Sequence, residues 1–156
     1  MIRLQPSKGP RPSHMVAATF EEEEMRVSID DNKALLQRYM SEVWDAGNPE
    51  AVTRFLAPDY RRHSSPTAES IDLAGQITRL KGFREAFPDI TIELDDIVAA
   101  EDRVAFRSTM RGTHLGRFHG IPPTGQEVTV GLIDVIRIED GRFVEQWGGP
   151  DLFDLL

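Results

Sequence analysis

Residues 127–139 read EVTVGLIDVIRIE, and apolar and polar positions alternate along most of this stretch. A period of two is the pattern of a β-strand with one face in the core and the other toward solvent. One face carries a single ionisable residue, Asp134, among five aliphatic residues: Val128, Val130, Leu132, Ile136 and Ile138. The stretch therefore predicts a long strand with one carboxylate on its apolar face.

Further strands of the same period are predicted on both sides of this one. They span residues 90–99, 103–114 and 142–147. The short turns Glu101-Asp102 and Asp140-Gly141 join neighbouring strands, and a long loop rich in Pro and Gly precedes residue 127. Strands joined by such short turns are typical of hairpins. We therefore expect an antiparallel sheet.

Three helices are predicted before this sheet. The first spans residues 28–46, where Ser28 can cap the helix and apolar residues recur every three or four positions. A short helix over residues 49–56 and an extended segment follow. The third helix spans about residues 70–87 and ends at Pro88. Helices followed by strands in this order indicate an α+β domain whose helices pack on one face of a curved antiparallel sheet.

Composition limits the domain organisation and the partners. A chain of 156 residues is long enough for one domain, which we expect over residues 27–156. Residues 1–26 contain several prolines and a run of glutamates, and we expect a disordered leader or a cloning remnant. The net charge of −8 repels phosphate backbones and anionic lipids, so we expect neither a nucleic-acid nor a membrane partner.

Cysteine and long apolar segments are both missing from the sequence. Without cysteine there is no disulfide, thiolate metal site or cysteine nucleophile. No apolar run is long enough to cross a bilayer, and the first residues do not form a secretory signal. We therefore expect a cytoplasmic protein.

Asp134 is the main candidate for chemistry. If its face of the strand points into the core, burial disfavours the charged form of the carboxylate, and a carboxyl of this kind can shuttle a proton. The alternative is structural, because Asp134 can accept hydrogen bonds from a neighbouring strand or pair with an arginine. The sequence leaves both interpretations open.

Two histidines are further candidates for contact with a ligand. His114 ends a predicted strand between Gly112 and Gly116, and His63 follows the second helix. The alternative for each is a histidine bound to neighbouring backbone, and His119 lies in a turn that we expect to be exposed. Because the histidines lack the close pairing of metal ligands and no cysteine can assist, we expect no metal site.

Residues 111–125, RGTHLGRFHGIPPTG, resemble the signature of the SnoaL-like polyketide cyclases, in which Gly-x-His-x-Gly-x-Phe precedes Gly-Ile-Pro-Pro-Thr. The similarity covers about residues 29–156 and includes 57–60, 87–89, 137–141 and 145–147. It implies the nuclear-transport-factor-2-like fold, a cone-shaped roll of curved antiparallel sheet capped by three N-terminal helices. It also implies aldol ring closure of a polyketide ester without a cofactor, with an aspartate as acid and base.

The resemblance also implies positions for the site residues. The catalytic aspartate of the family falls on Gly148, so this sequence lacks that carboxylate. The pocket histidine of the family falls on Asp134. Further pocket positions fall on Trp44, Arg62 and Leu132, and we add Tyr39, Tyr60 and Gln146 to the predicted pocket wall.

Two functional hypotheses follow. In the first, Asp134 moves a proton on a carbonyl-bearing substrate, and His63, His114 or Gln146 donates hydrogen bonds to the developing oxyanion. That enzyme would be a cyclase, isomerase or hydrolase that needs no cofactor. In the second, the pocket binds a small apolar or polyketide-like molecule without reaction, as in a carrier or accessory protein. The opposite face of the strand carries Thr129, Ile133 and Val135, which predicts a homodimer.

Overall fold

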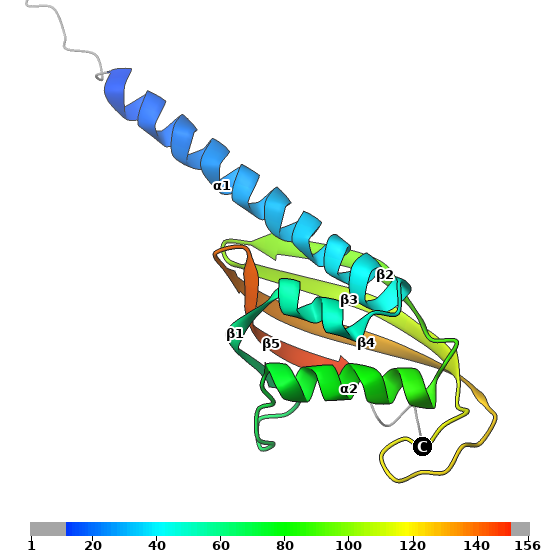
Figure 1. The fold of residues 1–156 in the computed structure, drawn as a ribbon. Coiled ribbons are helices and arrows are strands. Elements are labelled where there is room, and N and C mark those ends of the chain that lie inside the picture. Colours follow the sequence, from blue (N-terminus) through cyan, green and yellow to red (C-terminus); the bar gives the residue numbers. More distant parts are fainter. Residues whose placement is uncertain (1–11, 151–156) are drawn as a thin grey trace, which may run out of the picture.

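The computed structural model describes residues 12–150 of the chain (Figure 1). Its elements, in chain order, are helix α1 (Pro12–Tyr39), the π-helical turn η1 (Met40–Asp45), the 3-10 helix η2 (Pro49–Arg54), strand β1 (Leu56–His63), helix α2 (Leu73–Ala86) and strands β2 (Thr91–Ala100), β3 (Arg103–Thr113), β4 (Glu127–Glu139) and β5 (Arg142–Pro150). The predicted α+β class and its three helical regions are confirmed. The described residues include no helix with the length and apolar character of a membrane span.

The strands form one sheet in the order β1-β5-β4-β3-β2. Strands β2 to β5 pair in antiparallel fashion, as predicted. Asp140 and Gly141 join β4 to β5, and their φ angles of 49° and 68° suit a two-residue hairpin turn. Strand β1 differs from the prediction, because it pairs with β5 in parallel and makes the sheet mixed. No hairpin links these two strands, since α2, β2, β3 and β4 lie between them in the chain.

The alternation expected along β4 is confirmed. Val130 and Ile136 are fully buried and Asp134 is 5% exposed, whereas Ile133 is 66% exposed. Helices cover one face of the sheet (Figure 1), and Asp134 lies on that covered face, with the helix residues Trp44 and Phe83 nearby. We call this the inner face of the sheet and the opposite one the outer face.

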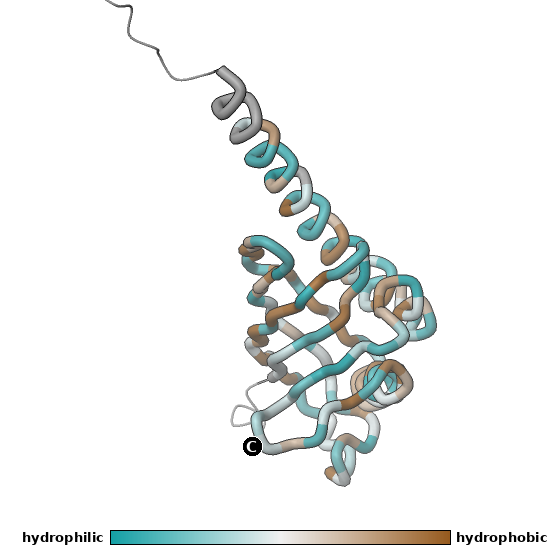
Figure 2. The backbone as a smooth tube through the Cα atoms, turned by 90° about the vertical axis from the view of Figure 1, so that its left-hand side faces the viewer, coloured by the Kyte–Doolittle hydropathy of each residue, from teal (hydrophilic) through white to brown (hydrophobic). Residues whose placement is uncertain are grey.

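Helix α1 begins at Pro12, so its predicted start at Ser28 is wrong. The residues before Ser28 include alanines and four consecutive glutamates, which are good helix formers, and the helix runs through them without needing a cap. Figures 1 and 2 show this part of α1 projecting away from the sheet, and residues 19–26 are exposed. The predicted leader is thus helical from Pro12 onward, and residues 1–11 lie outside the described part.

The core fills the space between the helices and the inner face. The end of α1 and the turn η1 bury the predicted apolar stripe: Leu36, Tyr39, Met40, Val43 and Trp44. Helix α2 begins at Leu73, where the carboxylate of Asp72 accepts a hydrogen bond from the backbone N–H of Gly75 at 2.8 Å. Its buried side chains include Gln76, Leu80 and Phe83. The stripe of η1 and the buried side of α2 therefore face the sheet together.

Candidate functional site

A cavity of about 40 Å³ lies between these helices and the inner face of the sheet. Since one water molecule needs roughly 10–15 Å³ of such space, the cavity has room for a few atoms of a ligand in this state. Its apolar wall includes Trp44 and Phe83 from the helices and Phe106 and Leu132 from the sheet. The cavity is narrow, and the predicted ligand pocket stays a prediction.

Asp134 lies in the wall of this cavity and holds two hydrogen bonds. Its Oδ1 accepts one from Arg62 Nη2 at 3.1 Å and one from Gln146 Nε2 at 2.9 Å. The three residues come from the adjacent strands β1, β5 and β4, and all three are buried. The arginine pairing that the sequence left open is thus present. It supplies the opposite charge that a buried carboxylate requires.

The polar contacts continue beyond Asp134 on both sides. The hydroxyl of Tyr60 donates to Gln146 Oε1 at 2.7 Å, and Arg62 Nη2 also donates to the carbonyl of Gly148 at 2.7 Å. Burial raises the pKa of Tyr60 well above its ordinary value, so the phenol remains a donor at neutral pH. With its carbonyl held by Tyr60, the amide of Gln146 can only present its N–H groups to Asp134.

Most of the predicted pocket residues meet at this cavity. Tyr39, Trp44, Arg62, Leu132, Asp134 and Gln146 all line it. Tyr60 is fully buried and contacts the cavity through its hydrogen bond to Gln146. The two histidines are not among the lining residues.

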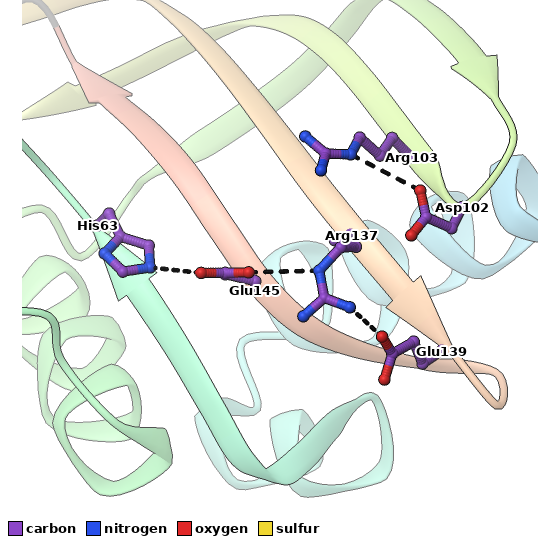
Figure 3. Close-up of polar contacts among 6 residues, drawn as sticks. All are labelled: His63, Asp102, Arg103, Arg137, Glu139 and Glu145. Atoms are coloured by element: carbon purple, nitrogen blue, oxygen red, sulfur yellow. Dashed lines mark hydrogen bonds and ion pairs between the residues drawn. The ribbon is translucent and has the colours of Figure 1, made fainter.

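His63 lies on the outer face of the sheet. Because successive residues of a strand point to opposite faces, β1 sends Arg62 to the cavity and His63 away from it. His63 Nε2 is 2.9 Å from Glu145 Oε1, and its ring stacks on that of Trp147 with centroids 5.5 Å apart. Arg137 donates to the other oxygen of Glu145 (Figure 3). His63 therefore does not line the cavity with Asp134.

His114 is buried at the end of β3 but faces the following loop. Its Nδ1 is 3.1 Å from the hydroxyl of Thr124, and its ring packs against Phe87 with centroids 5.3 Å apart. The backbone of His114 also bonds to Gln126 and Gly125. These contacts fix the loop and correspond to the structural alternative for this residue. His114 does not line the cavity with Asp134, its buried Nε2 has no partner in the structure, and its contact with a ligand stays a prediction.

Three polar residues of the cavity wall were missed by the sequence analysis: Gln76, Arg79 and Ser108. Gln76 and Arg79 are one turn apart on α2, and Ser108 lies on the inner face of β3 beside Leu132. Burial, and next the positive charge of Arg62, lower the pKa of Arg79 to about 10. The available signal was the spacing of Gln76 and Arg79 among the apolar positions of α2, which places both on the buried side.

Among residues 12–150, no group of three His, Cys, Asp or Glu side chains is placed to hold a metal ion.

The model of the family SnoaL-like polyketide cyclase matches residues 34–156. The chain belongs to this family. AclR of Streptomyces galilaeus, whose proposed activity is that of a hydroxylase, is 34% identical with a TM-score of 0.73, over 82% of this chain and 80% of AclR. IdmH of Streptomyces antibioticus, whose proposed activity is that of a polyketide cyclase, is 31% identical with a TM-score of 0.68, over 80% of this chain and 97% of IdmH.

A third solved structure, TsrD of Streptomyces laurentii, is 30% identical to this SnoaL-like chain with a TM-score of 0.71, over 81% of this chain and 92% of TsrD. A search of curated proteins gives no match. The SnoaL-like fold that the motif in residues 111–125 implied is therefore confirmed, and the reaction is a separate question.

Gly148 occupies the position where the resemblance places the aspartate of SnoaL-like cyclases. It pairs directly with Asp134 across β4 and β5 and has a φ of 117°. A Cβ atom here would lie 2.2 Å from the carbonyl oxygen of Ile133 and 2.9 Å from the Cα of Asp134. This backbone therefore has no room for a carboxylate at Gly148, and Asp134 is the one carboxylate in the described wall of the cavity.

Proposed function

We propose that this SnoaL-like protein binds a small carbonyl-bearing organic molecule in the cavity and that Asp134 moves a proton on it without a cofactor. The observation that carries the proposal is the geometry of the carboxylate. Both hydrogen bonds of Asp134 end on Oδ1, and no described residue donates one to Oδ2. One oxygen is thus held by Arg62 and Gln146, and the other is left for a ligand.

The chemistry that suits this arrangement is enolisation followed by ring closure. Oδ2 takes a proton from the carbon next to a carbonyl, and the C–H electron pair forms the C=C bond of an enolate. The negative charge moves to the carbonyl oxygen, which the guanidinium group of Arg62 stabilises, since its Nε has no partner in the structure. The enolate carbon then bonds to a second carbonyl of the same molecule, and the alkoxide that forms takes the proton from Asp134.

The similarity to IdmH supports the proposed ring closure. The proposed activity of IdmH is that of a polyketide cyclase, and the family model that matches this chain carries the same description. The cavity has to widen for such a ligand. Met40 and Met110 lie in its wall, and methionine side chains are flexible enough to repack around a guest.

Exchange of hydrogen for deuterium tests the proton transfer directly. Methyl 2-acetylbenzoate, which carries an acetyl group and an ester, is incubated in D2O with the protein, and deuterium in its methyl ketone is followed by NMR. The wild-type protein should accelerate exchange over buffer. Asp134→Asn should lower that acceleration by roughly 100-fold or more, because positioned acid and base groups contribute on that order. Asn retains an oxygen that can accept from Arg62 and Gln146, and circular dichroism checks that the variant folds.

Asp96→Asn is the matched control, since Asp96 is an exposed carboxylate on β2. Asp96→Asn should accelerate deuterium exchange in the substrate as much as the wild-type protein does. If the wild-type protein does not exceed the buffer rate, or if Asp134→Asn matches the wild type, the catalytic proposal fails. The non-catalytic alternative, a carrier whose Asp134 only pairs with Arg62, then remains.

We also propose that two copies of the chain pair through the outer face of the sheet. Val98 and Ile133 are 61% and 66% exposed there, and Arg107 and Asp95 beside them form an exposed ion pair. A surface with both charges around an apolar centre can face a second copy of itself. Sedimentation velocity should give a dimer for the wild type and a monomer for Ile133→Asp.

Leu115→Asp is the control for this experiment, because Leu115 is 56% exposed but lies in the loop after β3. It should leave the dimer intact. A monomeric wild-type protein contradicts the proposal.

A further inference from the structure

The charges in the cavity wall do not balance. Two guanidinium groups, Arg62 and Arg79, face one carboxylate, Asp134. Arg79 is partly buried, and a positive charge that has lost part of its water is stabilised when an anion binds beside it. The cavity therefore has the electrostatic character of a site for a negatively charged group.

The positive charge of Arg62 is already balanced by Asp134. Its Nη2 donates to Asp134 and to the carbonyl of Gly148. Its pairing with Asp134 neutralises both charges within the inner face of the sheet.

Arg79 has no direct ion-pair partner among the described residues, although the charge of Asp134 attracts it from a greater distance. Within residues 12–150, no carboxylate lies within ion-pair distance of its guanidinium, which instead packs over the ring of Phe83 at 4.7 Å from the centroid. Although burial lowers its pKa to about 10, Arg79 remains charged at neutral pH. By contrast, the arginines of the outer face, Arg107 and Arg137 among them, have acidic partners.

Unused hydrogen-bond donors lie in the same wall. The hydroxyl of Ser108 and the Nε of Arg62 are buried and have no partner in the structure. Ser108 and Arg62 are 1% and 2% exposed. Buried polar atoms are nearly always bonded, so unbonded donors in a cavity wall indicate an acceptor that arrives with a ligand.

We propose that the ligand carries a carboxylate and that Arg79 binds it, with Ser108 as an additional hydrogen-bond donor. This inference rests on the proposed function of the cavity and adds the chemical class of its ligand. The carboxylate anchors the molecule on the α2 side, while the carbonyl-bearing part lies toward Asp134. A cationic ligand is disfavoured, because it would meet the unpaired charge of Arg79.

Benzoate and benzamide are the probes that test this assignment, because they have the same size and differ in charge. NMR titration of the folded full chain at neutral pH should give a dissociation constant for benzoate at least tenfold lower than that for benzamide. In Arg79→Gln, benzoate binding should weaken by about 10- to 100-fold, the range expected for a hydrogen bond to a charged group. Benzamide binding should change little.

Two further variants test whether benzoate binding depends on the positive charge at position 79. Arg79→Lys keeps the charge and should keep the preference for benzoate. Arg107→Gln removes an arginine that is 59% exposed on the outer face, and it should bind both probes as the wild type does.

The carboxylate assignment is overturned if wild-type protein binds the two probes equally or does not bind benzoate. It is also overturned if folded Arg79→Gln binds benzoate as tightly as wild type. If deuterium exchange still depends on Asp134 in that case, the proposed function stands and only the ligand class is withdrawn.

Discussion

Replacement of Gly148 by alanine probes the closest backbone approach in the site. In the present backbone, the new Cβ would lie 2.2 Å from the carbonyl oxygen of Ile133 and 2.9 Å from the Cα of Asp134. Both atoms belong to the main chain of β4, so no side-chain rotation can relieve the contact. The φ of 117° is a second obstacle, since side chains rarely tolerate that conformation.

The magnitude follows from these two terms. A strained backbone conformation costs about 1–3 kcal/mol, and overpacking of a dense region costs a further 1–3 kcal/mol or so. We therefore expect Gly148→Ala to lower the free energy of unfolding by about 2–6 kcal/mol. Relief of the contact would move β5 away from Asp134 and from Arg62, which donates to the carbonyl of Gly148. This displacement of β5 should also weaken ligand binding.

Urea unfolding followed by circular dichroism measures the change, and Gly131→Ala on β4 is the matched control. A Cβ at Gly131 meets no atom within 4 Å, and its φ is not in the positive region. That substitution should alter the free energy of unfolding by no more than about 1 kcal/mol. If Gly148→Ala is as stable as Gly131→Ala, the reasoning from the close approach is refuted.

Two further predictions concern charge. Arg62→Met and Asp134→Leu should each lower the free energy of unfolding by about 3–5 kcal/mol, because each leaves a buried charge without its partner. The double variant removes both charges and should lose far less than the sum of the two single losses. Additive losses in urea unfolding would contradict this. Asp89 accepts hydrogen bonds from the backbone N–H and hydroxyl of Thr113, both at 2.7 Å, and these lower its pKa from the ordinary 3.8. Its stabilisation is thus present above pH 3.8 and is lost as the pH falls through the lower folded-state value. Asp89→Asn should lower the melting temperature near neutral pH, and this effect should shrink as the pH falls below 3.8. An effect that does not change with pH would contradict the assignment.

The sheet could be predicted in detail from the sequence because its signals are local. Alternation along β4 placed Asp134 on the buried face, and Asp140-Gly141 indicated the hairpin to β5. The direction of β1 was not predictable in the same way. Its pairing with β5 joins residues far apart in the chain, and no turn sequence encodes such a pairing.

The candidate site could be predicted only in part. Which side chains enter it depends on the alternation of residues along each strand and on how each helix is rotated about its axis. His63 was expected in the pocket, but its neighbour Arg62 points there instead, and a shift of one residue exchanges the faces of a strand. Arg79 was overlooked because a charged residue on a helix is usually solvated. The start of α1 was misplaced since Ser28 resembles a cap but stands within a longer run of helix formers.

The π-helical turn η1 has a consequence for how this scaffold tolerates changes in length. Met40 and Trp44 lie within it and both belong to the cavity wall. A π-helical turn contains one residue more than the corresponding α-helical turn, and each residue of an α-helix rotates the chain by about 100°. Deletion of a single residue here would convert the turn to regular α-helix and swing the indole out of the wall. The place of the indole in the cavity wall thus depends on one inserted amino acid, and homologues without that insertion would have to supply the aromatic group from a different position.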